Sequence, residues 1–136
     1  MSMNAVFEIA SSAMTAQSKR LNVVASNLAN VDSAASSTGG AYKAKQVVFS
    51  AQPVGRDKSA VGVRVAGVID DPSPPRLQFD PNHPLADARG YVTMPNVDAV
   101  EEMVNMISAS RAYQTNADVM NAAKTMTLRT LSLLQT

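Results

Sequence analysis

Both ends of the chain carry apolar residues at helical spacing. Over residues 3–31, large apolar side chains recur every seven positions: Phe7, Met14, Leu21 and Leu28. The neighbouring seam holds Ala10, Val24 and Val31, interrupted by the polar Gln17. A heptad repeat of this kind is typical of a helix that pairs with another helix. We therefore predict one long amphipathic helix that ends near residues 30–32.

The carboxyl-terminal segment predicts a second, longer helix, because no glycine or proline occurs from residue 97 to residue 136. Asn96 or Asp98 can cap its free amides, and Glu101 and Glu102 suit the positive end of the helix dipole. Its apolar stripe consists of Val100, Met103, Met106, Ile107, Tyr113, Ala117, Met120, Leu128, Leu131 and Leu134. We predict that this stripe is core within the chain; a methionine-rich groove for a partner is the alternative.

The middle of the chain has a different pattern. Residues 33–40 are small and polar with two glycines, which predicts a loop. Residues 42–49 and 61–69 are rich in β-branched residues with partial alternation and predict short strands, in the form of a hairpin. Six of the seven prolines lie between residues 70 and 95, which predicts extended or turn-rich backbone.

The predicted fold is mainly α with a small β-region. Long N- and C-terminal helices pair as an antiparallel coiled coil, with short strands and the extended Pro-rich segment between them. We divide the chain into an N-terminal core helix (1–32), a middle region (33–95) and a C-terminal core helix (96–136). Together these form one structural domain.

Composition narrows the functional classes. The net charge of +1, without a basic cluster, argues against nucleic acid, and no apolar run is long enough for an integral membrane span. The chain has no cysteine and one histidine, His83, so we expect neither an enzyme nor a cofactor. The only candidate metal ligands are Asp70, Asp71, Asp80, His83 and Asp87, which we interpret as solvated turn residues.

The first helix has few charges for a solvated helix. Residues 1–31 contain only Glu8, Lys19 and Arg20 as charged residues, and the rest of the surface is alanine, serine, threonine and asparagine. Small uncharged side chains can be buried at lower cost than charges, so we expect contacts on several faces. The N-terminus also lacks the basic and apolar regions of a cleaved signal peptide.

Several segments resemble a known family. Residues 18–33, from Ser18-Lys19-Arg20 through Asn30-Val31-Asp32-Ser33, resemble the N-terminal motif shared by flagellar rod, hook and hook-associated proteins. Residues 80–92, 94–97 and 102–116 resemble the rod proteins of this flagellar axial family, and together the matches cover nearly the whole chain. The resemblance implies a structural subunit of the bacterial flagellar basal-body rod, which assembles helically and transmits torque.

The same resemblance implies partners and location. Partners would be other copies of the chain and other rod proteins of the FlgB, FlgF and FliE types, with the surrounding basal-body rings as further neighbours. The rod crosses the periplasm, and its subunits are exported through the flagellar type III apparatus without signal cleavage. The rival interpretations are a soluble helical-hairpin adaptor or secreted effector, and a membrane-surface module, for which the helices lack a basic border.

We assign assembly and core roles to residues of both helices. Asn27 and Asn30 cap the first helix or bridge to a neighbouring chain, or simply stop the helix. Arg111 and Tyr113 contact a neighbour, or are a solvated charge and a core aromatic. The full set is Phe7, Met14, Leu21, Val24, Asn27, Leu28, Asn30, Met103, Ile107, Arg111, Tyr113, Asn116, Met120, Leu128, Leu131 and Leu134.

Overall fold

The computed structural model describes residues 3–35, 39–54 and 60–134. Its elements are, in chain order, α1 (Met3–Ala29), β1 (Lys45–Pro53), β2 (Val61–Asp70), β3 (Arg76–Phe79), β4 (Tyr91–Met94) and α2 (Ala99–Leu134). The chain is mainly helical with a small β-region, as the sequence predicted, and this region consists of two antiparallel sheets of two strands each. Neither described helix is long and apolar enough to cross a membrane.

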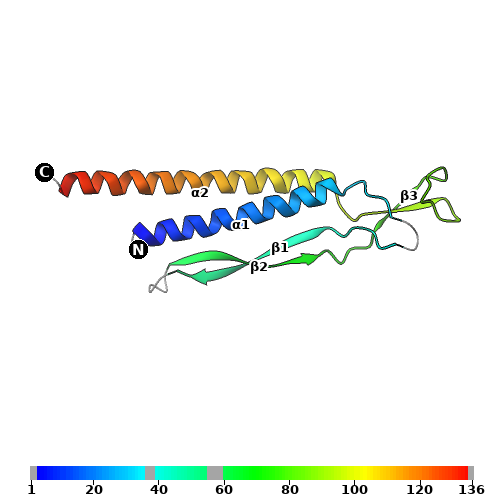
Figure 1. The fold of residues 1–136 in the computed structure, drawn as a ribbon, viewed down its shortest axis with the longest axis horizontal. Coiled ribbons are helices and arrows are strands. Elements are labelled where there is room, and N and C mark those ends of the chain that lie inside the picture. The colour runs from blue at the N-terminus through cyan, green and yellow to red at the C-terminus, as the bar shows by residue number, and fades with distance from the viewer. Residues whose placement is uncertain (1–2, 36–38, 55–59, 135–136) are drawn as a thin grey trace.

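The two helices lie side by side and run in opposite directions (Figure 1). The end of α1 is level with the start of α2, where Arg20 contacts Asn105. Since α2 has 36 residues against 27 in α1, its carboxyl-terminal end extends past α1 by about 14 Å. We call the last eleven residues of α2, residues 124–134, which include this extension, the overhang; it is the red end of α2 in Figure 1.

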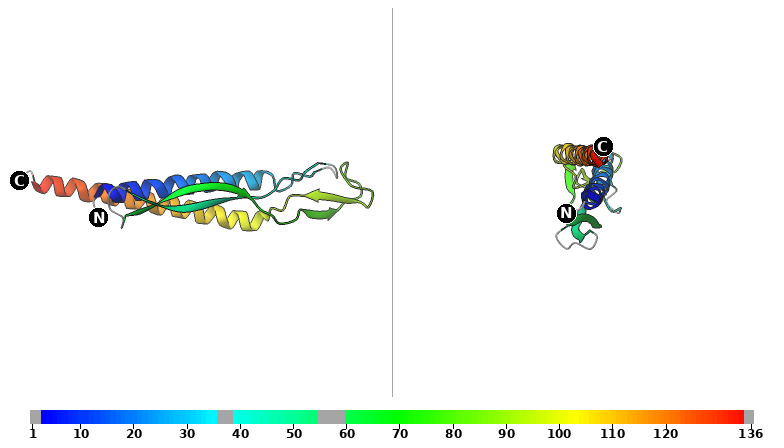
Figure 2. Two further views of the ribbon diagram at one scale, coloured as in Figure 1. Left: turned by 90° about the horizontal axis from the view of Figure 1, so that it is seen from below. Right: turned by 90° about the vertical axis from the view of Figure 1, so that its left-hand side faces the viewer.

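The β1–β2 hairpin covers a second side of α1, so α1 contacts both α2 and the hairpin and lies between them in Figure 1; Figure 2 shows the same elements from two other directions. The strands pair from Lys45↔Asp70 to Pro53↔Val61, with a bulge after Val48. Close approach to α1 depends on Gly62, because a Cβ there would lie 2.7 Å from the Ser12 hydroxyl. The expectation that α1 makes contacts on several faces is met within the chain.

The β3–β4 hairpin forms the far end of the molecule (Figure 1) and was not predicted as strands. Phe79 and Tyr91 pack edge to face with ring centroids 5.3 Å apart. Gly90 has φ 83°, a conformation that favours glycine. The Asp87 carboxylate accepts hydrogen bonds from the Arg89 and Tyr91 amides at 2.8 and 2.9 Å. These bonds stabilise the connection between β3 and β4. The two strands were not predicted because each is short and lies near prolines, so neither shows a clear alternation of apolar and polar residues.

The core between the helices is made of small side chains. The buried positions of α2 are Ala109 and Ala123, and Glu102 and Asn116 are half-buried at the same seven-residue spacing. On α1, Ala10 and Val24 are buried, while Phe7, Met14, Leu21 and Leu28 are half-buried. Small side chains at the contact let two helix axes approach closely, since the interaxial distance depends on side-chain size.

The prediction that the apolar stripe of α2 is core within the chain was wrong for most of its large members. Met106, Ala117 and Met120 are half-buried. Six others are exposed: Val100 (70%), Met103 (55%), Ile107 (55%), Tyr113 (37%), Leu128 (57%) and Leu131 (53%). The side chain of Leu134 lies outside the described ones. The apolar pattern was right for a helix, but the fully buried side chains of α2 are the small ones, Ala109 and Ala123.

Candidate assembly surface

Asn27 joins the end of α1 to the start of β1. Its side chain is fully buried, and its Nδ2 donates to the Lys45 carbonyl at 2.9 Å. Its Oδ1 accepts from the Lys45 amide and from the Tyr42 hydroxyl, both at 2.9 Å. Asn27 therefore does not cap α1 and is not exposed to solvent. We call its three hydrogen bonds to Tyr42 and Lys45 the Asn27 clamp. Burial is the main cause that raises the pKa of Tyr42, with the nearby Glu102 and Asp70 adding to it.

Different side chains form hydrogen bonds with the backbone groups at the end of α1 and at the start of α2. The Asn30 side chain donates to the Ser26 carbonyl at 2.8 Å, so it caps the end of α1. Capping was one of the roles predicted for Asn30. Asp98 caps α2, because its Oδ1 accepts from the Val100 and Glu101 amides at 2.8 and 3.1 Å.

Asn96, the other candidate cap of α2, instead joins loops. Its Oδ1 accepts from the Ala44 amide at 2.7 Å, and its Nδ2 donates to the Ser73 carbonyl at 3.0 Å. Sequence analysis missed this role and the role of Tyr42, since the partners of both are far away in the chain. An asparagine beside apolar residues was the only available signal.

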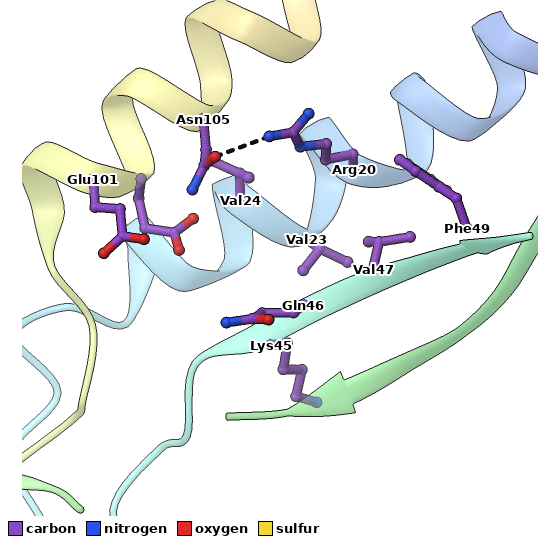
Figure 3. Close-up of a pocket in the computed structure, with 10 residues that line it drawn as sticks. Arg20, Val23, Val24, Lys45, Gln46, Val47, Phe49, Glu101 and Asn105 are labelled. Carbon is purple, nitrogen blue, oxygen red and sulfur yellow. Dashed lines mark hydrogen bonds between the residues drawn. The ribbon is translucent and has the colours of Figure 1, made fainter. Parts of the chain in front are cut away.

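A groove of about 420 Å³ lies where α1, α2 and β1 meet (Figure 3). Val23 of α1 and Val47 of β1 point toward one another across it, and Arg20 donates to Asn105 Oδ1 at 2.9 Å. Glu102 also lines the groove. Burial raises the pKa of the Glu102 carboxyl and Glu101 adds to the rise, whereas the Asn27 amide and Arg20 oppose it.

The polar residues that line the groove are Arg20, Lys45, Gln46, Glu101, Glu102 and Asn105. Among the described residues, no group of three histidine, aspartate or glutamate side chains is placed to hold a metal ion. Asp80 and Asp87 instead accept turn amides.

One exposed surface of α2 is apolar. Val100, Met103, Val104 and Ile107 are 55 to 70% exposed on consecutive turns of α2, and we call them the outer face. Helical periodicity places them opposite Glu102 and Ala109, which face α1. Val104 was not part of the predicted stripe, although it completes the i, i+4, i+7 spacing of Val100 and Ile107.

A second apolar surface lies on the overhang. Met126, Leu128 and Leu131 are 53 to 57% exposed, beside the exposed Lys124 and Arg129. No part of α1 reaches this far along α2 (Figure 1).

The remaining predicted residues are placed as follows. Arg111 is exposed, and Asn116 donates to the Ala112 carbonyl of its own helix at 2.7 Å. Tyr113, Met14 and Met120 line one shallow groove between the helices. Tyr113 is thus neither fully solvated nor a buried core aromatic.

Comparison with known proteins identifies the family. Residues 7–34 match the flagella basal body rod protein family, and residues 88–133 match the C-terminal family of the flagellar basal body rod FlgEFG proteins. The chain is 58% identical to the flagellar basal-body rod protein FlgC of Yersinia enterocolitica, over 99% of this chain and 100% of the relative. It is 55% identical to FlgC of Escherichia coli O157:H7, over 96% of each chain.

A more distant relative agrees. FlgC of Borreliella burgdorferi is 41% identical over 93% of this chain and 94% of its own length. The two family matches span Asn27 and the outer face of α2. This chain therefore belongs to the FlgC family of flagellar basal-body rod proteins, and its function is that of a structural subunit of the rod.

Proposed function

We propose that this subunit assembles into a helical rod through the apolar surfaces of its helices, and that the assembly transmits torque. The observation that carries the proposal is that most of the large apolar side chains of α2 are exposed, whereas its buried side chains are Ala109 and Ala123. Covering a half-exposed valine, isoleucine or methionine contributes about 1 kcal/mol, so the four residues of the outer face supply about 4 kcal/mol to assembly. Rigidity then comes from many such contacts repeated along the array.

The paired helices are the proposed inner core of the rod, with α1 and α2 as an antiparallel coiled coil. Heptad spacing on α1 and the seven-residue spacing of Glu102, Ala109, Asn116 and Ala123 on α2 support this pairing. Residues 1–32 and 96–136 are then the core segments, and residues 33–95 form the surrounding part. The predicted assembly residues of both helices, from Phe7 to Leu134, keep that role in this proposal.

The proposed partners are other copies of this chain and rod proteins of the FlgB, FlgF and FliE types, with the basal-body rings around them. Unlike surfaces on neighbouring subunits generate open helical arrays when the rotation between them does not close. The rod that they form crosses the periplasm, and the subunit reaches it by flagellar type III export without signal cleavage. We propose no catalytic activity, because the relatives of this chain are rod proteins.

The experiment is complementation of flagellated cells whose own copy is deleted. The unmodified chain should restore swimming and be recovered in isolated basal bodies. Ile107→Asp should abolish both, because it places a charge in a surface that other subunits cover. Gln114→Asp is the matched control, since Gln114 is exposed on the same helix and is already polar.

Both variants should keep the circular dichroism of the parent, because neither side chain is buried in the free chain. Normal swimming with Ile107→Asp would show that the outer face stays uncovered. That result would remove the proposed mode of assembly.

A further inference from the structure

The β3–β4 hairpin exposes an apolar face at the opposite end of the molecule from the overhang (Figure 1). Leu77, Phe79 and Tyr91 are 64, 63 and 41% exposed. They share one face, because Phe79 lies opposite Tyr91 and Leu77 is two residues before Phe79 in the same strand. The other face is covered, since Val92 and Met94 are 2 and 8% exposed. The apolar side of this hairpin therefore faces outward.

The hydrogen-bond pattern shows which backbone groups of β3 point away from β4. The Asp80 amide donates to the Gly90 carbonyl at 2.9 Å, one step beyond the Phe79↔Tyr91 pair. Bonded and non-bonded pairs alternate along an antiparallel ladder, so Phe79 and Leu77 belong to non-bonded pairs. The amides and carbonyls of these two residues therefore point to the outer edge of β3.

The outer edge of β4 is occupied within the chain. The Tyr91 amide donates to the Asp87 carboxylate at 2.9 Å, and the Tyr91 carbonyl accepts from the Asp87 amide at 2.8 Å. The Thr93 carbonyl accepts from the Ala35 amide at 2.9 Å. No described residue bonds the outer edge of β3 in this way. The hairpin thus has one free edge, formed by Leu77 and Phe79.

Prolines limit the length of this edge. Pro75 and Pro81 lie two residues before Leu77 and two residues after Phe79. Proline has no amide hydrogen, so neither position can donate a hydrogen bond across the edge. The free edge therefore takes a short strand and is protected from pairing with a long one.

The edge is also held in its extended conformation before any partner binds. The Phe79 ring packs against Tyr91 with centroids 5.3 Å apart. Gly90 turns the chain with φ 83°, and a Cβ at this position would lie 3.0 Å from the Phe79 ring. A strand that is already in its bound conformation loses less entropy when a partner pairs with it.

We propose that an extended segment of a different rod protein pairs with β3 as a third strand. The proposal rests on the rod function above and names the kind of partner that this end of the molecule takes. A strand is favoured over a helix, because an extended backbone can bond the outward amides and carbonyls of Leu77 and Phe79 together. Apolar side chains at alternate positions of the added strand cover the side chains of the same two residues.

Charge adds a further property of the partner. Arg76 is exposed beside the free edge, at the start of β3. An acidic side chain on the added strand, opposite Arg76, forms an ion pair with it and sets the register of the contact. The partner segment is therefore apolar at two alternate positions and acidic at the next one.

The β1, β2 and β4 strands of a second copy do not fit this description. β1 and β4 contain no acidic residue. The only acidic residue of β2 is Asp70. With Asp70 opposite Arg76 in an antiparallel pair, the residue opposite Phe79 is Gly67, which has no side chain to cover the ring.

The β3 strand of a second copy matches the chemistry but not the assembly. In an antiparallel pair of two β3 strands, Asp80 would lie opposite Arg76 and Leu77 opposite Phe79. Both copies would use the same edge, so a two-fold axis would relate them and the contact would close as a dimer. Because a helical rod needs contacts that do not close, we assign the edge to another protein.

Photo-crosslinking identifies the partner. The full-length chain, with benzoylphenylalanine at position 77, replaces the native copy in flagellated cells, and basal bodies are isolated after irradiation. Mass spectrometry should find position 77 joined to an extended segment of another rod protein. The same group at position 89 is the matched control and should not capture that segment, because Arg89 is exposed on the hairpin but lies outside β3.

Two substitutions of similar size test the backbone contact. Leu77→Pro removes the outward amide, and Leu77→Val keeps it; both leave the Gln78↔Val92 pair in place. Each variant is expressed together with the tagged parent, and the ratio of the two chains in basal bodies is measured. The ratio should fall about tenfold for Leu77→Pro, the effect of one lost hydrogen bond, and stay near that of the parent for Leu77→Val. Equal ratios for two folded variants would overturn strand pairing.

Reversing the charge tests the acidic residue of the partner. Arg76→Glu should lower the crosslink yield from position 77 about fivefold, the effect of an exposed ion pair at its upper limit. An unchanged or higher yield would overturn the acidic partner.

The outcomes separate this inference from the proposed function. Basal bodies that contain the chain but no crosslink from position 77 would overturn the third strand and leave the rod function standing. Capture of a second copy of this chain, or of a helix of another protein, would overturn the proposed partner. Absence of the unmodified chain from basal bodies would remove the proposed function, and this inference with it.

Discussion

Replacing the Asn27 clamp by alanine tests how the small core is held together. Asn27→Ala removes the partner of the Lys45 amide, the Lys45 carbonyl and the Tyr42 hydroxyl, and it also removes the amide that lowers the pKa of Glu102. A buried polar group left without a partner costs about 1–3 kcal/mol. Lys45 lines the open groove and Tyr42 is only half-buried, so water can replace some of the lost bonds. We expect a loss of about 2–4 kcal/mol in the free energy of unfolding.

The measurement is urea unfolding of the purified chain followed by circular dichroism. Two variants calibrate it. Tyr42→Phe removes one of the three bonds and should cost about 1 kcal/mol, and Asn30→Ala removes one exposed bond to Ser26 and should cost less. Asn27→Asp keeps the shape but directs an acceptor at the Lys45 carbonyl, so it should be at least as damaging as alanine. If Asn27→Ala cost no more than Asn30→Ala, the clamp would not be a stability determinant.

Three further predictions use the same unfolding assay. Gly62→Ala should cost about 1–3 kcal/mol, because its Cβ would lie 2.7 Å from a Ser12 hydroxyl held by two hydrogen bonds, and Ser12→Ala should recover part of that loss. Asp98→Ala should cost about 1 kcal/mol through the lost cap of α2, whereas Asp98→Asn should cost much less. Because burial raises the pKa of Glu102, its ionisation opposes folding above that pKa and has no effect below the unfolded value. Glu102→Gln should therefore raise the urea midpoint at neutral pH and leave it unchanged in strong acid; the opposite order would contradict the assigned direction.

Much of the secondary structure could be predicted from local signals. The heptad spacing of α1, the absence of glycine and proline after residue 96 and the position of Asp98 located both helices to within a few residues. The β-branched segments located the β1–β2 hairpin. Local propensity and capping act between near neighbours in the chain, so the sequence alone contains this information.

The β3–β4 hairpin and the role of Asn27 depended on contacts distant in sequence. Arg76–Phe79 pairs with Tyr91–Met94 across a turn-rich connection, and neither strand is long enough to show alternation. Asn27 is buried because Tyr42 and Lys45 fold back onto the end of α1. Nothing within one helical turn of Asn27 distinguishes it from an exposed asparagine such as Asn22.

The sequence by itself determined that α2 is a helix with an apolar stripe, and that the chain carries too little charge on α1 for a solvated helix. Only the tertiary structure decided which side of α2 meets α1. Alanines at positions 109 and 123 allow the two helices to approach closely, so the small side is used inside the chain. The large side of Val100, Val104 and Ile107 is left outside, because an apolar pattern specifies that a surface is to be covered and does not specify by which chain.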